Sequence, residues 1–200
     1  MRLRILLSLL IFTSLTTNVE NAFASGSSLI PFYRLPFTET VMIFQGPKCE
    51  PSHLGTEAID FGLIDGTPVY AAMGGNLISG WDSSVWSGYS LGNYVKITDN
   101  HGDTAIYAHL SKIVIDTGYV SQGTLIGYSG NSTAGEKEIG FHLHFEVRGP
   151  ENQLINIRSL NGIVWTDPDQ PCLPGQIDGM AYGPPLNLPR EMENRRPNMR

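Results

Sequence analysis

Short apolar runs separated by glycine recur along the middle of the chain. Their length, and the Gly, Asn and Asp residues between them, are typical of strands joined by turns. The turn-rich "DNHG" between two of the runs predicts a hairpin, and no stretch shows an amphipathic helix of more than a few turns. The pattern therefore predicts an all-β or mostly β domain of antiparallel strand pairs. The runs lie at residues 66–72, 75–81, 92–98, 103–110, 123–130 and 141–147.

The last run, "FHLHFEV", carries two histidines in a strand-like pattern. Side chains alternate along a strand, so His142 and His144 share one face, while Leu143 and Phe145 share the other. The apolar face can pack on a core, which leaves the histidine face free to line a groove. A histidine on a strand is also often an ordinary surface residue, so a metal site and a plain surface both remain open for this pair.

Two further segments contain candidate ligands. In "DTAIYAHL", strand alternation places Tyr107 on the same face as His109, where Tyr107 either lines a groove or simply packs. In "SHLGTEAIDFG", His53 precedes Asp60, and Asp60 lies between apolar residues. A buried carboxylate is costly unless it is paired or bound to a metal. Imidazole and carboxylate are zinc ligands, and a catalytic zinc takes three protein ligands and keeps one position for water.

Composition agrees with one folded domain flanked by less regular ends. The 200 residues are 41% apolar and 16% charged, as in globular proteins, and the net charge of -6 lacks the basic footprint of nucleic-acid binding. Residues 25–44 form a proline-containing lead-in, and we assign 45–150 to the main domain. Residues 151–200, rich in Pro, Asn and charge, are expected to form a C-terminal extension with a disordered end.

The first 24 residues have the features of a secretory signal. Arg2 and Arg4 precede an apolar run at 5–15 that is too short to span a bilayer, and "AFA" at 22–24 has the pattern that a signal peptidase cuts after. A membrane anchor is the alternative interpretation. The signal predicts an exported protein, periplasmic or secreted, without a membrane anchor in its mature form, and we expect a monomer.

Both cysteines lie beyond this signal. Outside the cytoplasm Cys49 and Cys172 can form a disulfide, which would tie the tail to the start of the domain. The alternatives are two free thiols, or a metal-ligand role for Cys49, which lies shortly before His53.

Taken together, the motifs resemble those of the lysostaphin/LytM-type zinc endopeptidases. "SHLGTEAIDFG", "GTPVYAA", "GNYVKI", "YAHLS" and "HLHFEV" occur here in the family's order, over about residues 45–150. The resemblance implies an antiparallel β-sheet core under a groove that holds one zinc. It implies that His53, Asp60 and His144 bind the metal, and that His109 and His142 assist a zinc-bound water and stabilise charge in the transition state.

Three features depart from the family pattern, and one of them is the long connection at 81–91 before "GNYV". Many members have the first histidine four residues before the aspartate, where this chain has Thr56, so we expect an inserted loop to deliver His53. The usual Gly-Pro before the histidine pair is here Gly140-Phe141, and Phe141 is expected to shape the groove floor.

The resemblance implies an exported zinc endopeptidase that cuts peptide bonds of peptidoglycan, in the cross-bridge or the stem peptide. Two other hypotheses stay open. One is an inactive member of the fold that binds and regulates another cell-wall hydrolase. The other is an exported metal-binding or structural protein without hydrolytic activity. The presence of all five candidate residues favours an active enzyme.

Overall fold

The computed structural model of the protein describes residues 33–85, 90–135, 138–167, 172 and 178–185. The chain divides into two units, Met1–Ile30 and Pro31–Arg200, and every described residue belongs to the second. The predicted signal, residues 1–24, and the predicted disordered end lie outside the described residues. Within the described part, no helix is long and apolar enough to cross a membrane.

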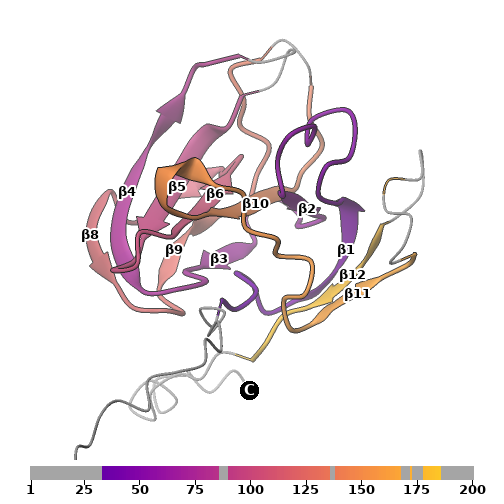
Figure 1. The fold of residues 1–200 in the computed structure, drawn as a ribbon. Helices are drawn as coiled ribbons and strands as arrows, with labels where there is room; N and C mark the ends of the chain where they lie inside the picture. Colours follow the sequence, from indigo (N-terminus) through magenta and orange to yellow (C-terminus); the bar gives the residue numbers. More distant parts are fainter. Residues whose placement is uncertain (1–32, 86–89, 136–137, 168–171, 173–177, 186–200) are drawn as a thin grey trace, which may run out of the picture. The chain divides into compact units, whose positions relative to one another are not determined.

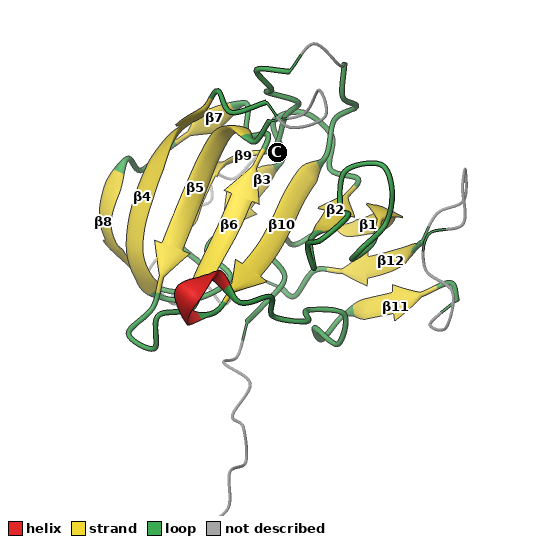
Figure 2. Cartoon of the chain, turned by 45° about the horizontal axis from the view of Figure 1, so that its top comes forward, coloured by secondary structure: helices red, strands yellow, loops and turns green. Residues whose placement is uncertain are grey.

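Two antiparallel sheets form the framework of the described part of the second unit (Figure 1; Figure 2). The larger has the strand order β11-β12-β1-β2-β10-β6-β5-β4-β8, and the smaller has the order β3-β9-β7. Among the described residues, the sole helix is a single 3₁₀ turn, Pro150–Asn152. The predicted mostly β, antiparallel fold class is therefore confirmed. The strands are β1 Thr40–Gln45, β2 Ile59–Phe61, β3 Pro68–Tyr70, β4 Gly75–Asp82, β5 Gly92–Thr98, β6 Thr104–Ala108, β7 Lys112–Ile113, β8 Thr117–Val120, β9 Leu125–Tyr128, β10 Leu143–Arg148, β11 Ile163–Trp165 and β12 Gly179–Tyr182.

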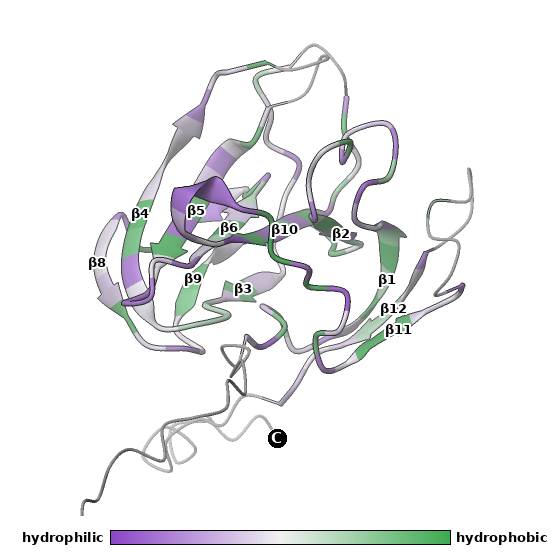
Figure 3. Ribbon diagram, in the orientation of Figure 1, coloured by the Kyte–Doolittle hydropathy of each residue, from purple (hydrophilic) through white to green (hydrophobic). Residues whose placement is uncertain are grey.

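The two sheets share one hydrophobic core. In β10, Leu143, Phe145 and Val147 are completely buried, and Val69 and Ile126 of the smaller sheet belong to the same cluster. Buried and exposed residues alternate over the first four residues of β4, which is expected of a strand with one face on the core, and Figure 3 shows both hydrophobic and hydrophilic residues along this strand. The apolar alternation in the sequence is therefore the feature that assembles the sheet.

The larger sheet extends beyond both ends of the range 45–150. β1 crosses the expected boundary between the lead-in and the main domain, and it pairs with β12 from the C-terminal range. β11 then pairs with β12. These two C-terminal strands have only three and four residues, too few for a clear alternating pattern. Segments that resembled irregular flanks in the sequence therefore complete the edge of the sheet.

Cys49 and Cys172 form a disulfide, with their Cα atoms 5.2 Å apart. The bond confirms the first of the alternatives weighed from the sequence, and it removes both thiols from the set of candidate metal ligands. It joins residues 123 positions apart in the sequence. On the chain-entropy model a loop of that length stabilises the fold by about 5 kcal/mol.

Of the two alternatives for Tyr107, groove lining and packing, the structure shows the second, because Tyr107 lies in the core. Its side chain is completely buried, its ring centroid is 5.2 Å from that of Phe145, and its hydroxyl accepts a hydrogen bond of 2.7 Å from the N–H of Ala72. Tyr107 pairs with Phe145 across β6 and β10, so both face the core. The alternation that linked Tyr107 to His109 breaks at His109, where φ is 62°.

We expect Tyr107→Phe to lower the free energy of unfolding by about 1–3 kcal/mol, because the buried N–H of Ala72 loses its acceptor. Urea denaturation of the variant and the parent protein measures the difference. Tyr119→Phe is the matched control, since the Tyr119 side chain is 74% exposed, and it should change the value by less than about 0.5 kcal/mol. Equal stability of Tyr107→Phe and the parent would contradict a structural role for this hydroxyl.

Candidate metal centre

Asp60 and His144 lie directly opposite each other on neighbouring strands. They are partners in the register of β2 and β10. The residues beside them, Phe61 and Leu143, are completely buried in the core. Since successive side chains in a strand point to opposite faces, Asp60 and His144 both project from the other face of the sheet. The pairing of two short strands thus sets a carboxylate beside an imidazole.

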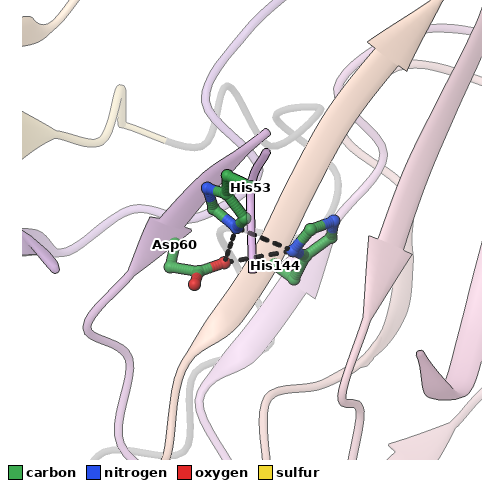
Figure 4. A group of neighbouring side chains, drawn as sticks. All are labelled: His53, Asp60 and His144. Carbon is green, nitrogen blue, oxygen red and sulfur yellow. Dashed lines mark hydrogen bonds and ion pairs between the residues drawn. The ribbon is translucent and has the colours of Figure 1, made fainter. Parts of the chain in front are cut away.

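His53 reaches the same place from the loop between β1 and β2. Its backbone N–H donates a hydrogen bond of 2.9 Å to the carbonyl of Cys49, and its Nδ1 lies 2.9 Å from the carbonyl oxygen of Gly46. An imidazole that donates Nδ1–H to a carbonyl has its Nε2 free as an acceptor or a metal ligand. This Nε2 points toward Asp60 and His144 (Figure 4).

Three candidate ligand atoms form a small triangle. Nε2 of His53 is 3.1 Å from Oδ1 of Asp60 and 3.3 Å from Nδ1 of His144, and that Nδ1 is 3.1 Å from the same carboxylate oxygen. A tetrahedral zinc with nitrogen and oxygen ligands at about 2.0–2.2 Å places those ligands about 3.3 Å apart. All three residues are buried. Two imidazoles and one carboxylate in this arrangement fit a zinc ion without rearrangement of the cluster.

Two more histidines flank the triangle. The ring centroid of His109 is 4.6 Å from that of His142 and 5.7 Å from that of His144. Nδ1 of His109 lies 2.9 Å from the carbonyl oxygen of Ser132, and Nδ1 of His142 lies 2.8 Å from that of Gly140. Each ring can therefore donate Nδ1–H to the backbone and keep Nε2 for the site. Nε2 of His142 is 3.7 Å from Oδ2 of Asp60.

His109 leaves strand geometry at the end of β6. Its φ of 62° lies in the left-handed region, which is uncommon for residues other than glycine and costs about 1–3 kcal/mol. Its N–H still donates to the carbonyl of Leu91, and the next residue, Leu110, donates to Asn93 and is completely buried. The single left-handed residue therefore turns one imidazole toward the triangle while the chain on both sides stays in the core.

The charges of the triangle shift the pKa values of Asp60 and His53 in opposite directions. Burial raises the pKa of Asp60, but the charges of His53 and His142 and the hydrogen bonds from His144 and His53 outweigh it and hold that pKa well below its usual range. Burial lowers the pKa of His53, but the Asp60 carboxylate outweighs it, so the pKa is raised above its ordinary value of 6.5. The Asp60 carboxylate therefore favours the protonated form of His53, and a bound cation would compete with that proton.

The pKa of His109 is lowered, whereas that of His53 is raised. Burial lowers its pKa, and the charges of His142 and His144 lower it further, to about 3. The ring is therefore neutral in the metal-free protein near pH 7, and its Nε2 is a proton acceptor.

A cavity of about 350 Å³ opens over this cluster, lined in part by Asp60, His109, His142 and His144. Phe141 lies between Gly140 and His142, which both line this cavity. Its own side chain is 47% exposed and is not among the lining residues, so its role in shaping the groove floor stays a prediction. Sequence reasoning missed several lining residues, since they come from separate strand ends and loops without a common motif: Gln45, Ser52, Asp82, Ser90 and Glu138.

Thr56 stands where many members of the resembled family have their first histidine. It lies outside the triangle, and its hydroxyl donates a hydrogen bond of 2.6 Å to Oε2 of Glu146 in β10. Its N–H donates to the carbonyl of His53. Arg148 also donates to Glu146, at 2.9 Å. Thr56 therefore closes the turn that carries His53 and ties this turn to the strand that carries His144.

Comparisons with known proteins match the same part of the chain. The model of Peptidase family M23 matches residues 55–157, which include Asp60, His109, His142 and His144 and begin just after His53. The peptidoglycan DD-endopeptidase ShyA of Vibrio cholerae is 41% identical over 102 residues, which are 48% of this chain and 21% of ShyA. The chain therefore spans about one fifth of the length of this relative.

Solved structures also match this chain. The catalytic domain of the antimicrobial peptidase lysostaphin from Staphylococcus simulans is 28% identical with a TM-score of 0.43, over 60% of this chain and 84% of that one. A zinc-containing peptidase from Vibrio cholerae is 30% identical with a TM-score of 0.47, over 62% of this chain and 38% of that one. The family model covers more than half of the sequence, and the chain therefore belongs to peptidase family M23.

Proposed function

We propose that this protein is an exported, zinc-dependent endopeptidase that hydrolyses peptide bonds in peptidoglycan. The observation that carries the proposal is the triangle of His53, Asp60 and His144 with two further imidazoles beside it, at the base of a cavity. Family membership supports a peptidase, and the likeness to a peptidoglycan endopeptidase supports the substrate. The apolar segment at 5–15 and the Cys49–Cys172 disulfide support export, because disulfides persist in oxidising compartments.

Each residue of the cluster has a role that follows from its position. His53, Asp60 and His144 would hold the zinc ion, which supplies a Lewis acid and an activated water at neutral pH. The backbone carbonyl of Gly46 orients the ring of His53 through Nδ1. No glutamate on a helix is needed as a base in this scheme, because two imidazoles already lie beside the triangle.

His109 and His142 would carry out the proton transfers. Both present Nε2 to the site, since their Nδ1 atoms are occupied by carbonyl oxygens. One ring would accept the proton of the attacking water at Nε2. The other would donate a hydrogen bond to the developing oxyanion or a proton to the leaving amine. The cavity that both rings line would hold the scissile peptide against them.

An inactive regulator of another hydrolase is the alternative function. Loss of a ligand or of a flanking histidine would favour it, but all five side chains are present and gathered in one cluster. A metal-binding protein without hydrolysis is less well supported, because the two flanking imidazoles would then have no task. An active enzyme therefore gives a role to all five side chains of the cluster, whereas each alternative leaves some of them without one.

Digestion of peptidoglycan tests the proposal. The purified protein is incubated with peptidoglycans of different cross-bridge composition, with and without a zinc chelator, and mass spectrometry identifies the released fragments. We expect new amine and carboxyl ends that disappear with the chelator and with His142→Ala. One bound zinc per chain without cleavage of any substrate would contradict the enzyme and favour the regulator.

Variants of the cluster should separate metal binding from proton transfer. We expect His109→Ala and His142→Ala to lower kcat/KM by about 10²–10⁴-fold while zinc stays bound, because each removes one acid–base or hydrogen-bonding group. His144→Ala should instead lose the zinc, as measured by atomic absorption after dialysis. Val164→Ala is the control, since Val164 is 58% exposed on β11. Full activity of both His109→Ala and His142→Ala would exclude the assigned roles.

The metal-free protein should lose stability as the pH rises above about 6.5, the ordinary pKa of histidine. A raised His53 pKa contributes stability that is fully present below the ordinary value of 6.5 and is lost as the pH rises through the folded-state pKa. A lowered Asp60 pKa contributes stability present above 3.8 and lost as the pH falls. Thermal unfolding of chelator-treated protein between about pH 7 and 9 measures this loss, because the lowered pKa of His109 has the opposite effect below pH 6.5.

His53→Gln should flatten this alkaline loss, and zinc loading should remove it, because the metal takes the place of the proton. His101→Gln, at an exposed turn, serves as the control and should keep the slope of the parent protein. A slope that is the same in His53→Gln and the parent would contradict the pairing of His53 with Asp60.

A further inference from the structure

Asp178 lies where the C-terminal hairpin meets the start of the His53 loop. It immediately precedes β12, and its side chain is buried. Its backbone N–H donates a hydrogen bond of 2.9 Å to the carbonyl of Ile43 in β1. Its carbonyl accepts one of 2.9 Å from Thr166, just after β11. Backbone hydrogen bonds to β1 and to the residue just after β11 therefore fix the backbone of Asp178.

The carboxylate of Asp178 holds two distant segments together. Oδ2 accepts a hydrogen bond of 2.8 Å from the N–H of Gly46, and Oδ1 accepts one of 3.1 Å from the N–H of Cys172. Cys172 is also joined to Cys49 by the disulfide. The carboxylate and the disulfide thus connect the same part of the C-terminal range to the same loop, the loop that carries His53.

Gly46 links the Asp178 carboxylate to the imidazole of His53. Its N–H is held by Asp178, and its carbonyl oxygen lies 2.9 Å from Nδ1 of His53. The packing is close, because a Cβ on Gly46 would meet the ring of Trp165 at 3.0 Å and Oδ2 of Asp178 at 3.3 Å. The chain of contacts therefore runs from a buried carboxylate, through one residue's peptide groups, to the ring whose Nε2 faces Asp60.

We propose that Asp178 is the positioning residue for His53: by fixing Gly46 it sets the orientation of the imidazole that would bind the metal. The inference rests on the metal role proposed for His53. Asp178 and Gly46 both lie outside residues 55–157, the segment that matches the family model. The residues that orient His53 in this chain, Gly46 and Asp178, therefore lie outside the segment that the family model matches. The arrangement is consistent with His53 standing in place of a ligand at Thr56.

Zinc affinity of the purified protein tests the inference, by competition with a chromogenic chelator. Removing a partner that orients a metal ligand typically weakens metal affinity by 10–100-fold, and we expect that loss for Asp178→Ala. Asp178→Asn keeps one oxygen acceptor and should lose less. Asp103→Asn is the matched control, because Asp103 is also buried and accepts a hydrogen bond of 2.6 Å from Tyr33 away from the cluster. We expect it to leave zinc affinity within about twofold of the parent, although it lowers stability.

Hydrogen exchange of the metal-free protein gives a second readout that needs no zinc. The amides of Gly46, His53 and Thr56 are hydrogen-bonded, and they should exchange faster in Asp178→Ala and Asp178→Asn than in Asp103→Asn. If the parent binds zinc and both Asp178 variants bind it equally tightly, the inference is overturned while the proposed function stands. If the parent binds no zinc, the proposed function fails. Unchanged exchange at these three amides would then overturn the positioning role as well.

Discussion

A carboxylate that is removed from water needs positive charge or hydrogen-bond donors around it, and Asp60 has both. It lies among apolar neighbours on β2, yet its two oxygens are within reach of His53, His144 and His142. His53 comes from the loop before β2, whereas His142 and His144 lie two residues apart around the start of β10. The contacts of this one buried carboxylate therefore link the loop before β2 to β10 and to the residue just before that strand. Those contacts are made through protons or through a metal ion.

The sheet provides the precision that such a cluster requires. Because β2 and β10 are paired in register, Asp60 and His144 cannot move apart without breaking backbone hydrogen bonds in the core. β6 on the other side of β10 brings His109 alongside, with one left-handed residue at the turn into the site. The loop of His53 is the least regular support, and it is held by Thr56 on one side and by Gly46 on the other.

Much of this could be predicted from the sequence, because apolar alternation decides which face of a strand is buried. The rule placed His142 and His144 opposite Leu143 and Phe145, as the structure has them. It failed for Tyr107, since it assumes that the strand continues, whereas the backbone at His109 is left-handed. The short strands β11 and β12 were missed for a related reason, as three or four residues carry too little pattern.

Long-range contacts mark the other limit of the sequence. The residues His53 and Asp60 could be singled out by their chemistry, but nothing in the spacing shows that the loop between them folds back to bring the two side chains to 3.1 Å. The pairing of Cys49 with Cys172 stayed one of several alternatives for the same reason. The contact of Asp178 with Gly46 joins positions that no local pattern relates.

X-ray absorption spectroscopy of the zinc-loaded protein, compared with His53→Ala, tests the central claim most directly. We expect only nitrogen and oxygen neighbours at about 2.0–2.2 Å from the metal, with the scattering pattern of two imidazoles in the parent protein and of one in the variant. The same number of imidazoles in both proteins, or no stable zinc in the parent, would contradict the metal centre described above.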